Sequence, residues 1–180
     1  MKKIISCILF GALLVSLAFS LLACDGVGEY SEYGINFRLP KDFKKVNVQS
    51  LDIRYSASDA TFDVQYIPKS QFESSNSEDG GLGMDFNMTV KEYTEFLIEW
   101  NGWSREDEDS QYEYDEKRNA TTFYFCWTPD AEKLPNSYYY VTVMKSETAF
   151  YVAMFYCLEE NSAIYEEKFK DWSAYLSLVE

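Results

Sequence analysis

Apolar residues alternate with polar ones in several short stretches of this chain and recur with a near-helical period in two longer ones. Alternation predicts strands in seven stretches, namely 33–40, 46–55, 60–67, 111–117, 120–127, 137–145 and 148–157. The connections around 56–59 and 145–147 are short and polar, as in hairpin turns. The last three stretches, which are joined by 128–136 and by the tight turn 145–147, are predicted to form an antiparallel meander.

The helical period predicts two amphipathic helices. The first begins at Thr89-Val90-Lys91-Glu92, a capping box in which the hydroxyl and carboxylate side chains bond each other's backbone amides, and it ends at Gly102. Its predicted buried face carries Val90, Tyr93, Leu97 and Trp100. The second helix is expected over 161–179, with a face formed by Tyr165, Phe169, Trp172, Leu176 and Val179. The polar stretch 69–87 predicts a long loop.

Two of the predicted strands are apolar on both faces. In Phe123–Trp127 and in Phe150–Cys157 neither alternating set is polar. A sheet with one face in water would alternate apolar and polar residues, so both faces of this sheet must be covered. With one helix on each face, the predicted fold is α+β, an α/β/α sandwich around a largely antiparallel sheet.

The chain begins with a basic and then an apolar segment. Met1-Lys2-Lys3 precedes the run Ile4–Leu22, and the junction is Leu21-Leu22-Ala23-Cys24, the order of a secretory signal peptide. The Leu-x-Ala-Cys ending resembles the lipobox of bacterial lipoproteins. That resemblance implies cleavage of residues 1–23 and a diacylglyceryl group on the Cys24 sulfur. An uncleaved anchor is the alternative, because a run of this length nearly spans a bilayer.

Lipidation predicts where the protein is found and how the rest of the chain is organised. Two acyl chains are sufficient for stable membrane attachment. We expect an anchor in the cell membrane that faces outside the cytoplasm, a polar tether at 24–32, and one globular domain at 33–180. The membrane, reached through the lipid on Cys24, is then the first predicted partner.

The opening of the predicted domain carries a family resemblance. The run from Gly34 to Phe43, Gly-Ile-Asn-Phe-Arg-Leu-Pro-Lys-Asp-Phe, resembles the start of PsbP-like domains, a fold named after an extrinsic protein of photosystem II. The mid-chain helix, the aromatic strands and the closing helix agree with that family over about residues 33–180. The resemblance implies a PsbP-like fold that binds partners and does not catalyse.

The charge of the chain restricts its partners. The net charge is −14, and cleavage would remove Lys2 and Lys3 but no acid, which leaves −16. A surface this acidic repels nucleic acid, so no nucleic-acid partner is expected. Aromatic residues make up 18% of the chain, enough for a dense core.

Two features leave alternatives open. Cys126 and Cys157 would remain after processing, either as a disulfide or as two buried free thiols, and the second is favoured because spacing does not fix their separation. The acidic run 106–109 is a solvated loop or a cation site. Because it lacks the spacing of a Ca²⁺ loop, the solvated loop is favoured.

The sequence offers little catalytic chemistry. It contains no His, which excludes the common nucleophile–base triads and the commonest metal ligand, and it has no P-loop or dinucleotide-binding glycine motif. We therefore predict no catalytic residues, no metal and no cofactor. Trp103 follows the helix-ending Gly102 and is the aromatic residue that core packing explains least, so it is the candidate for a binding surface.

Three functions are consistent with these features. The favoured hypothesis is a non-catalytic binding module that recognises a protein or another envelope component. The second is a receptor for a small ligand such as a sugar or peptide. The third is an acid-dependent envelope hydrolase, which would need two close carboxylates that the sequence does not identify.

Overall fold

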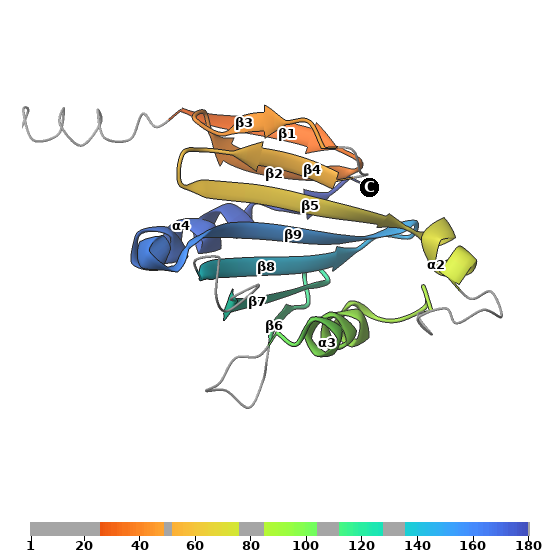
Figure 1. Ribbon diagram of the computed structural model, residues 1–180. Coiled ribbons are helices and arrows are strands. Elements are labelled where there is room, and N and C mark those ends of the chain that lie inside the picture. Colours follow the sequence, from red (N-terminus) through yellow and green to blue (C-terminus); the bar gives the residue numbers. More distant parts are fainter. Residues whose placement is uncertain (1–25, 49–51, 76–84, 104–111, 128–135, 180) are drawn as a thin grey trace, which may run out of the picture.

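The centre of the computed structural model is an antiparallel sheet of seven strands (Figure 1). The structure describes residues 26–48, 52–75, 85–103, 112–127 and 136–179. In spatial order the strands are β3 (Lys44–Val46), β4 (Asp52–Ser56), β5 (Ala60–Pro68), β9 (Ala149–Leu158), β8 (Ser137–Lys145), β7 (Ala120–Trp127) and β6 (Glu113–Asp115). The predicted meander is confirmed, since β7, β8 and β9 are consecutive antiparallel neighbours.

Both faces of the large sheet are covered, as predicted. One face, called the α3 face below, carries α2 (Lys69–Ser75) and α3 (Val90–Asn101). The other, called the α4 face, carries α4 (Ser162–Ala174), which follows the short turn η1 (Glu159–Asn161). A second sheet, β1 (Val27–Glu32), β2 (Ile35–Pro40) and β10 (Ser177–Leu178), shares the α4 face with α4 (Figure 1). The mixed α+β class with a large antiparallel sheet is confirmed.

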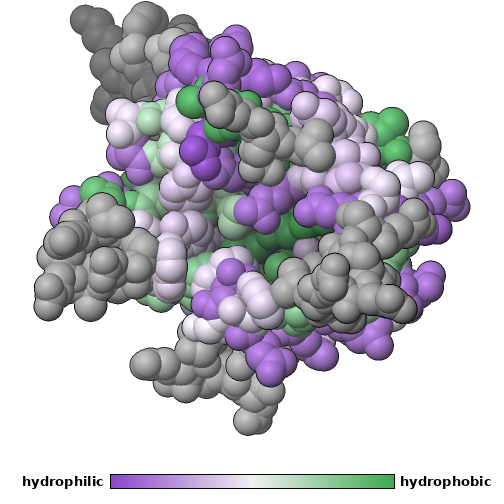
Figure 2. Space-filling view, turned by 45° about the vertical axis from the view of Figure 1, so that its right-hand side comes forward, coloured by the Kyte–Doolittle hydropathy of each residue, from purple (hydrophilic) through white to green (hydrophobic). Residues whose placement is uncertain are grey.

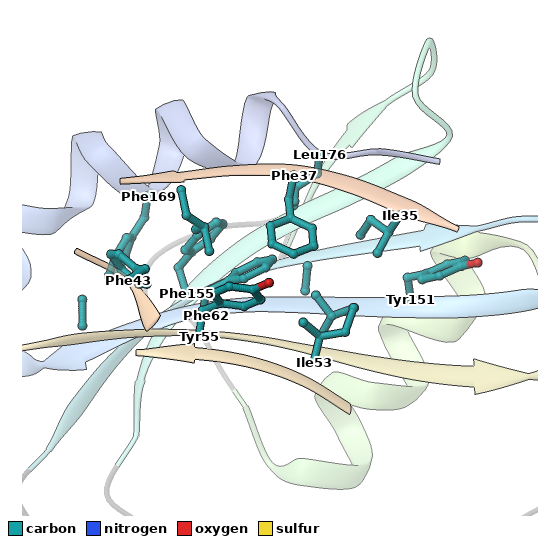
Figure 3. Close-up of a cluster of buried hydrophobic side chains, with 14 of the residues drawn as sticks. Ile35, Phe37, Phe43, Ile53, Tyr55, Phe62, Tyr151, Phe155, Phe169 and Leu176 are labelled. Carbon is teal, nitrogen blue, oxygen red and sulfur yellow. The ribbon is translucent and has the colours of Figure 1, made fainter. Parts of the chain in front are cut away.

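The core of the α4 face is built from stacked aromatic rings (Figure 3). Phe62 and Phe155, on neighbouring strands, lie 4.5 Å apart between ring centroids, and Phe155 also lies 5.5 Å from Phe169 of α4. Phe37 of the small sheet packs at 5.0 Å on Phe62. Contacts among the large sheet, the small sheet and α4 therefore bury this face.

On the α3 face, the helix is positioned by its predicted caps. The Thr89 hydroxyl accepts from the Glu92 amide at 3.2 Å, and the Thr89 amide donates to the Glu92 carboxylate at 2.7 Å. Gly102 ends the helix with φ of 65°, a left-handed conformation that glycine adopts without strain. Tyr93 then packs on Phe150 of β9 with centroids 4.3 Å apart.

The predicted tether is partly wrong. Val27–Glu32 is not a free segment but strand β1, paired in register with β2. Tyr33 and Gly34 join the two strands with φ values of 50° and 85°, as in the tightest hairpin turns. Tyr30 stacks on Phe37 at 5.3 Å, so a single aromatic side chain joins this polar strand to the core.

Two predicted boundaries also change. The loop expected at 69–87 begins with α2, whose Phe72 is buried against Phe150. The helix expected over 161–179 ends at Ala174, and β10 then pairs with β2. Leu176, just before β10, is buried. It would also be buried on a longer helix, so apolar periodicity did not distinguish a helix from a strand here.

Two aromatic positions differ from expectation. Trp100, assigned to the buried face of the first helix, is 62% exposed, because Thr94 and Ile98 occupy the buried face with Val90, Tyr93 and Leu97. The strand expected over 111–117 is limited to β6, whose Tyr114 is 39% exposed. Both aromatic side chains lie at the flanks of α3, and Lys91 lies over the Tyr114 ring at 4.0 Å.

The two cysteines are free. Cys126 of β7 and Cys157 of β9 both pair with Tyr138, which lies on β8 between them. Two strand spacings separate them, about 9.6 Å, whereas a disulfide needs Cα atoms within about 7 Å. Burial raises the pKa of the Cys157 thiol to about 11, so this cysteine is a small apolar core residue, as favoured above. Cys126 is exposed at the end of β7, so the expectation that both thiols are buried is wrong for this residue.

The hydroxyl of Tyr138 provides a test of the packing on the α4 face. The residue is buried against Phe169, and its hydroxyl has no hydrogen-bond partner among the described residues. We expect Tyr138→Phe to stabilise the fold by about 1 kcal/mol, because removal of an unsatisfied buried group relieves its desolvation cost. Denaturant unfolding measures the change.

Tyr151→Phe is the matched control for this prediction. The Tyr151 hydroxyl donates to the Tyr33 carbonyl at 2.9 Å, so its removal should destabilise the fold by about 1 kcal/mol. A loss of stability in Tyr138→Phe equal to that of the control would contradict the interpretation of an unsatisfied hydroxyl.

The described part of the chain contains no helix with the length and apolar character needed to cross a membrane. The predicted signal peptide, 1–23, and the lipidation site Cys24 lie outside the described residues.

Candidate functional site

Helix α3 covers only part of its face of the sheet. It packs on β7 and β8, and its flank towards β6 is held by the Tyr112 hydroxyl, which donates to Glu95 at 2.8 Å. Phe96 and Trp100 lie on the opposite flank, where their rings stack at 5.8 Å. Since Tyr93 of that flank contacts β9, this side of α3 borders the part of the sheet that the helix leaves open.

Register places a row of aromatic side chains next to that flank. Phe125 of β7 pairs with Tyr139 of β8, and Tyr139 pairs with Tyr156 of β9. Directly opposed residues of an antiparallel sheet project from the same face. Trp103, just beyond the end of α3, stacks on Phe125, so Trp103, Phe125, Tyr139 and Tyr156 form what we call the aromatic row.

The rings of the aromatic row are nearly parallel. Centroids are separated by 4.7 Å from Trp103 to Phe125, by 5.1 Å from Phe125 to Tyr139 and by 5.1 Å from Tyr139 to Tyr156. The interplanar angles are 19°, 6° and 24°, so the rings stack as a continuous ladder. Such contacts stabilise each other beyond simple area burial, which makes the surface rigid.

The row ends at an ion pair. The Tyr156 hydroxyl donates to Asp63 at 3.3 Å, and the Arg54 guanidinium makes two bonds to the same carboxylate, at 2.7 and 2.6 Å. Asp63 is 7% exposed and is the only buried carboxylate of the described residues. The paired geometry neutralises the buried charge and leaves the outer edge of Arg54 at the surface.

Other apolar side chains extend the row to the end of the sheet. Trp127 packs edge-on against Tyr139 at 6.3 Å and is 39% exposed. Leu158, on the same face by register, is 38% exposed, and Met154, which lies on the other side of Tyr156 along β9, is half-buried. We call the aromatic row together with Trp127, Met154 and Leu158 the aromatic face. Figure 2 turns forward the α2 end of the molecule, which is the end of the strands opposite Trp127 and Leu158, and shows there apolar residues in a hollow bordered by polar ones.

The electrostatics of the aromatic face favour binding over acid–base chemistry. Burial, with the nearby Asp63 carboxylate, raises the pKa of Tyr156 to about 12, and burial also raises the pKa of Tyr139. Both phenols are therefore neutral hydrogen-bonding groups near pH 7. Flat rings with hydroxyl edges can stack on a ligand and donate hydrogen bonds to it.

Packing explains part of the position of Trp103, the residue predicted for a binding surface. The side chain is half-buried on Phe125, so packing accounts for its position. It nevertheless forms one end of the aromatic face, where its exposed part is continuous with the other rings. Whether it binds a ligand stays a prediction.

Sequence reasoning missed most of the aromatic face. The three consecutive tyrosines 138–140 do not form one surface, because Tyr139 lies on the α3 face and its two neighbours on the α4 face. The sequence predicted Trp127 and Tyr156 only as strand residues, and Leu158 lies just beyond the predicted strand 148–157. Matching residues by alternation across β7, β8 and β9 would have grouped them, had the register been known.

Other predicted site residues are outside this region. The acidic run 106–109 lies beyond the described residues, as does Cys24. Within the described ranges, no group of three His, Cys, Asp or Glu side chains is placed to hold a metal ion.

A separate open cleft of about 970 Å³ lies at the end of the large sheet, between the β6–β7 turn, the β8–β9 turn and β10. Its floor includes the buried Met144 and Leu176. Two of its cations are already engaged: Arg118 bonds Asp115 at 2.7 Å and the Ser173 carbonyl at 2.9 Å, and Lys145 donates to the Met88 carbonyl at 2.7 Å.

Comparison with known proteins identifies the fold. No family model matches the sequence, and no curated protein matches it significantly. Among solved structures, the Ran-binding protein Mog1p of Saccharomyces cerevisiae superposes with a TM-score of 0.51 at 12% identity, covering 86% of this chain and 96% of Mog1p. Cyanobacterial PsbP of Synechocystis gives 0.51 at 10% identity over 86% and 93% of the two chains.

A third structure, from Bacteroides thetaiotaomicron, gives 0.51 at 7% identity but matches only 48% of that chain. At these identities the similarity establishes the fold alone. The PsbP-like fold expected from the opening motif is confirmed at that level, and the chain shares the architecture of Mog1p and cyanobacterial PsbP.

Proposed function

We propose that this protein is a lipid-anchored, extracytoplasmic binding module that recognises a protein partner through its aromatic face and catalyses no reaction. The observation that carries the proposal is the exposure of Trp127 and Leu158 beside a stacked row of rings, in which Phe125 is buried and the other three rings are half-buried. Contiguous apolar surface on a folded domain commonly marks an interaction site.

The make-up of this surface suits protein recognition. Interface hot spots are enriched in Trp, Tyr and Arg, and the aromatic face presents all three, with Arg54 at one edge. The row is rigid, so little side-chain freedom is lost on binding. Among proteins with the same fold, Mog1p is a Ran-binding protein, which is an example of this architecture in protein recognition.

The charge of the domain adds a further expectation. At a net charge of −16 after the proposed cleavage, the domain attracts basic partners over a distance, and salt weakens this attraction. Association should therefore be slower at high ionic strength, whereas the aromatic contact itself should depend little on salt.

We expect Trp127→Ala to reduce partner capture about tenfold or more, because it removes a ring at the exposed end of the aromatic face. The lipidated chain, carrying a photoreactive group beside the aromatic face, serves as bait in native membranes. Cross-linked proteins are then quantified by mass spectrometry. Since Trp127 is 39% exposed and the rest of its ring is buried, its loss also lowers the free energy of unfolding, so capture is measured where denaturant unfolding shows the variant to be folded.

Ile164→Ala is the matched control, because Ile164 is an apolar residue of α4, 57% exposed and remote from the aromatic face. Its capture profile should equal that of the wild type. Equal profiles for Trp127→Ala and the wild type would remove the aromatic face from the proposal. Turnover of peptidoglycan, glycan or ester substrates that depends on one carboxylate would instead favour an envelope hydrolase.

A small-ligand receptor is the second candidate, and the cleft near β10 favours it. The cleft combines an apolar floor with Lys117, an exposed cation at its rim. A small anionic ligand with an apolar part would fit this combination. Saturable binding that Lys117→Ala abolishes, and that Trp127→Ala leaves unchanged, would select this function over the first.

A further inference from the structure

The start of the described chain is tied to a turn that carries three lysines. The Lys41 amide donates to the Gly26 carbonyl at 2.9 Å. Gly26 follows Cys24 by two residues, and an extended chain spans at most about 3.6 Å per residue. A segment of two residues therefore reaches at most about 7 Å from Gly26.

The lysines of this turn are exposed and only partly neutralised. Lys41, Lys44 and Lys45 are all exposed, and we call them the lysine corner. Lys45 forms an ion pair with Glu32 at 2.5 Å. No carboxylate of the described residues pairs with Lys41 or Lys44, although the Lys44 ammonium donates to the Lys41 carbonyl at 2.7 Å.

The opposite edge of the molecule is acidic. Strand β3 of the lysine corner and strand β6 beside α3 are the two edges of the large sheet, six strand spacings or about 29 Å apart. The exposed residues of α3 include Glu92, Glu95 and Glu99. Figure 1 shows the first described residues and β3 at one edge, with α3 and β6 at the other. The separation exceeds the Debye length of about 8 Å at physiological salt.

We infer that the lysine corner is a membrane-contact surface that binds anionic lipid head groups and orients the domain with α3 and the β6 edge of the large sheet away from the bilayer. The inference rests on the lipid anchor of the proposed function but not on any partner. A lipid on Cys24 would hold Lys41 close to the head groups, within the range of the negative surface potential. Each basic residue there strengthens attachment about fivefold, whereas the acidic α3 edge is repelled.

The test uses the mature, lipidated chain in vesicles of phosphatidylcholine alone or of equal parts phosphatidylcholine and phosphatidylglycerol. A water-soluble amine reagent labels exposed lysines, and mass spectrometry measures the rate at each position. We expect Lys41 and Lys44 to react about fivefold more slowly in the anionic vesicles. Lys117, an exposed lysine next to β6, should react equally in both. About 1 M salt, with a Debye length near 3 Å, should abolish the difference.

A double variant, Lys41→Gln with Lys44→Gln, separates attraction from simple proximity. It keeps the Lys41 amide bond to Gly26, and Lys45 then serves as the reporter. The vesicle-dependent protection of Lys45 should disappear in the double variant and persist in Lys117→Gln. Equal labelling of the lysine corner in both vesicles would overturn the inference, as would protection of Lys117 in its place.

The outcomes of this test distinguish the membrane orientation from the proposed binding function. A chain that stays in solution with both vesicle types would disprove the anchor, and the inference with it. A protected lysine corner on a chain that captures no partner would leave the membrane orientation standing and remove the binding role of the aromatic face.

Discussion

A Cys24→Ala variant is expected to lose its stable attachment to the membrane. The substitution removes the only sulfur at the Leu21-Leu22-Ala23-Cys24 junction, so no thioether to a diacylglyceryl group can form. Because each buried CH₂ of an acyl chain contributes about 0.8 kcal/mol, loss of two chains removes the dominant attachment energy. Cell fractionation with metabolic labelling by fatty acid should show a released protein or an uncleaved, unlabelled precursor.

Cys126→Ala is the matched control for this experiment. Cys126 is a free, exposed thiol at the end of β7, so its removal should change neither the labelling nor the fractionation. If Cys24→Ala is labelled and fractionated like the wild type, the protein is not a lipoprotein of this type. The lysine corner would then have no anchor beside it.

Polar substitutions on either face of β9 are expected to destabilise the fold strongly. Val152 is 1% exposed on the α3 face, and Ala153 is 0% exposed on the α4 face. Val152→Asn removes about 1.5–3 kcal/mol of apolar burial and adds an unsatisfied amide that costs about 1–3 kcal/mol. Ala153→Asn adds the same amide and overfills a packed site, at about 1–3 kcal/mol more. Each variant should lose about 3 kcal/mol or more.

Denaturant unfolding of the unlipidated chain starting at residue 25 measures both variants. Gln65→Thr is the control, because Gln65 pairs with Val152 across the sheet but is exposed. Its stability should stay within about 0.5 kcal/mol of the wild type. A neutral result for Val152→Asn or for Ala153→Asn would mean that the corresponding face is solvated and that the layered fold is wrong.

The two ends of the molecule suggest a division of roles along the large sheet. The lysine corner lies near the proposed anchor, and the aromatic face and α3 extend towards the other edge. Attraction at one end and repulsion at the other would present α3, with the Trp103 end of the aromatic face, to partners outside the membrane. Neither role requires a reaction centre.

Several features of the fold were determined by local sequence. The capping box at Thr89 and the glycine at 102 define α3 by chemistry within a few residues, so the sequence predicted both ends. The doubly apolar stretches 123–127 and 150–157 predicted a sheet covered on both faces, because no strand in water would carry such a pattern. The connection 128–136 and the tight turn 145–147 predicted the β7–β8–β9 order.

Other features were decided by tertiary contacts. Val27–Glu32 is polar and has little tendency to bury, so only pairing with β2 and the stacking of Tyr30 on Phe37 make it a strand. The end of α4 could not be predicted from the sequence either, because Leu176 would be buried on a helix or before a strand. Strand β10 forms by pairing with β2, which is distant in the sequence.

The candidate site belongs to this second group. The sequence identified Trp103 from its position after a helix cap, but Phe125, Tyr139 and Tyr156 come from three strands that are distant in the chain. Which face each ring occupies depends on register, since a slip of one residue moves every side chain to the other face. The rings are therefore encoded locally as strand-forming residues, and only the register of the folded sheet gathers them into one surface.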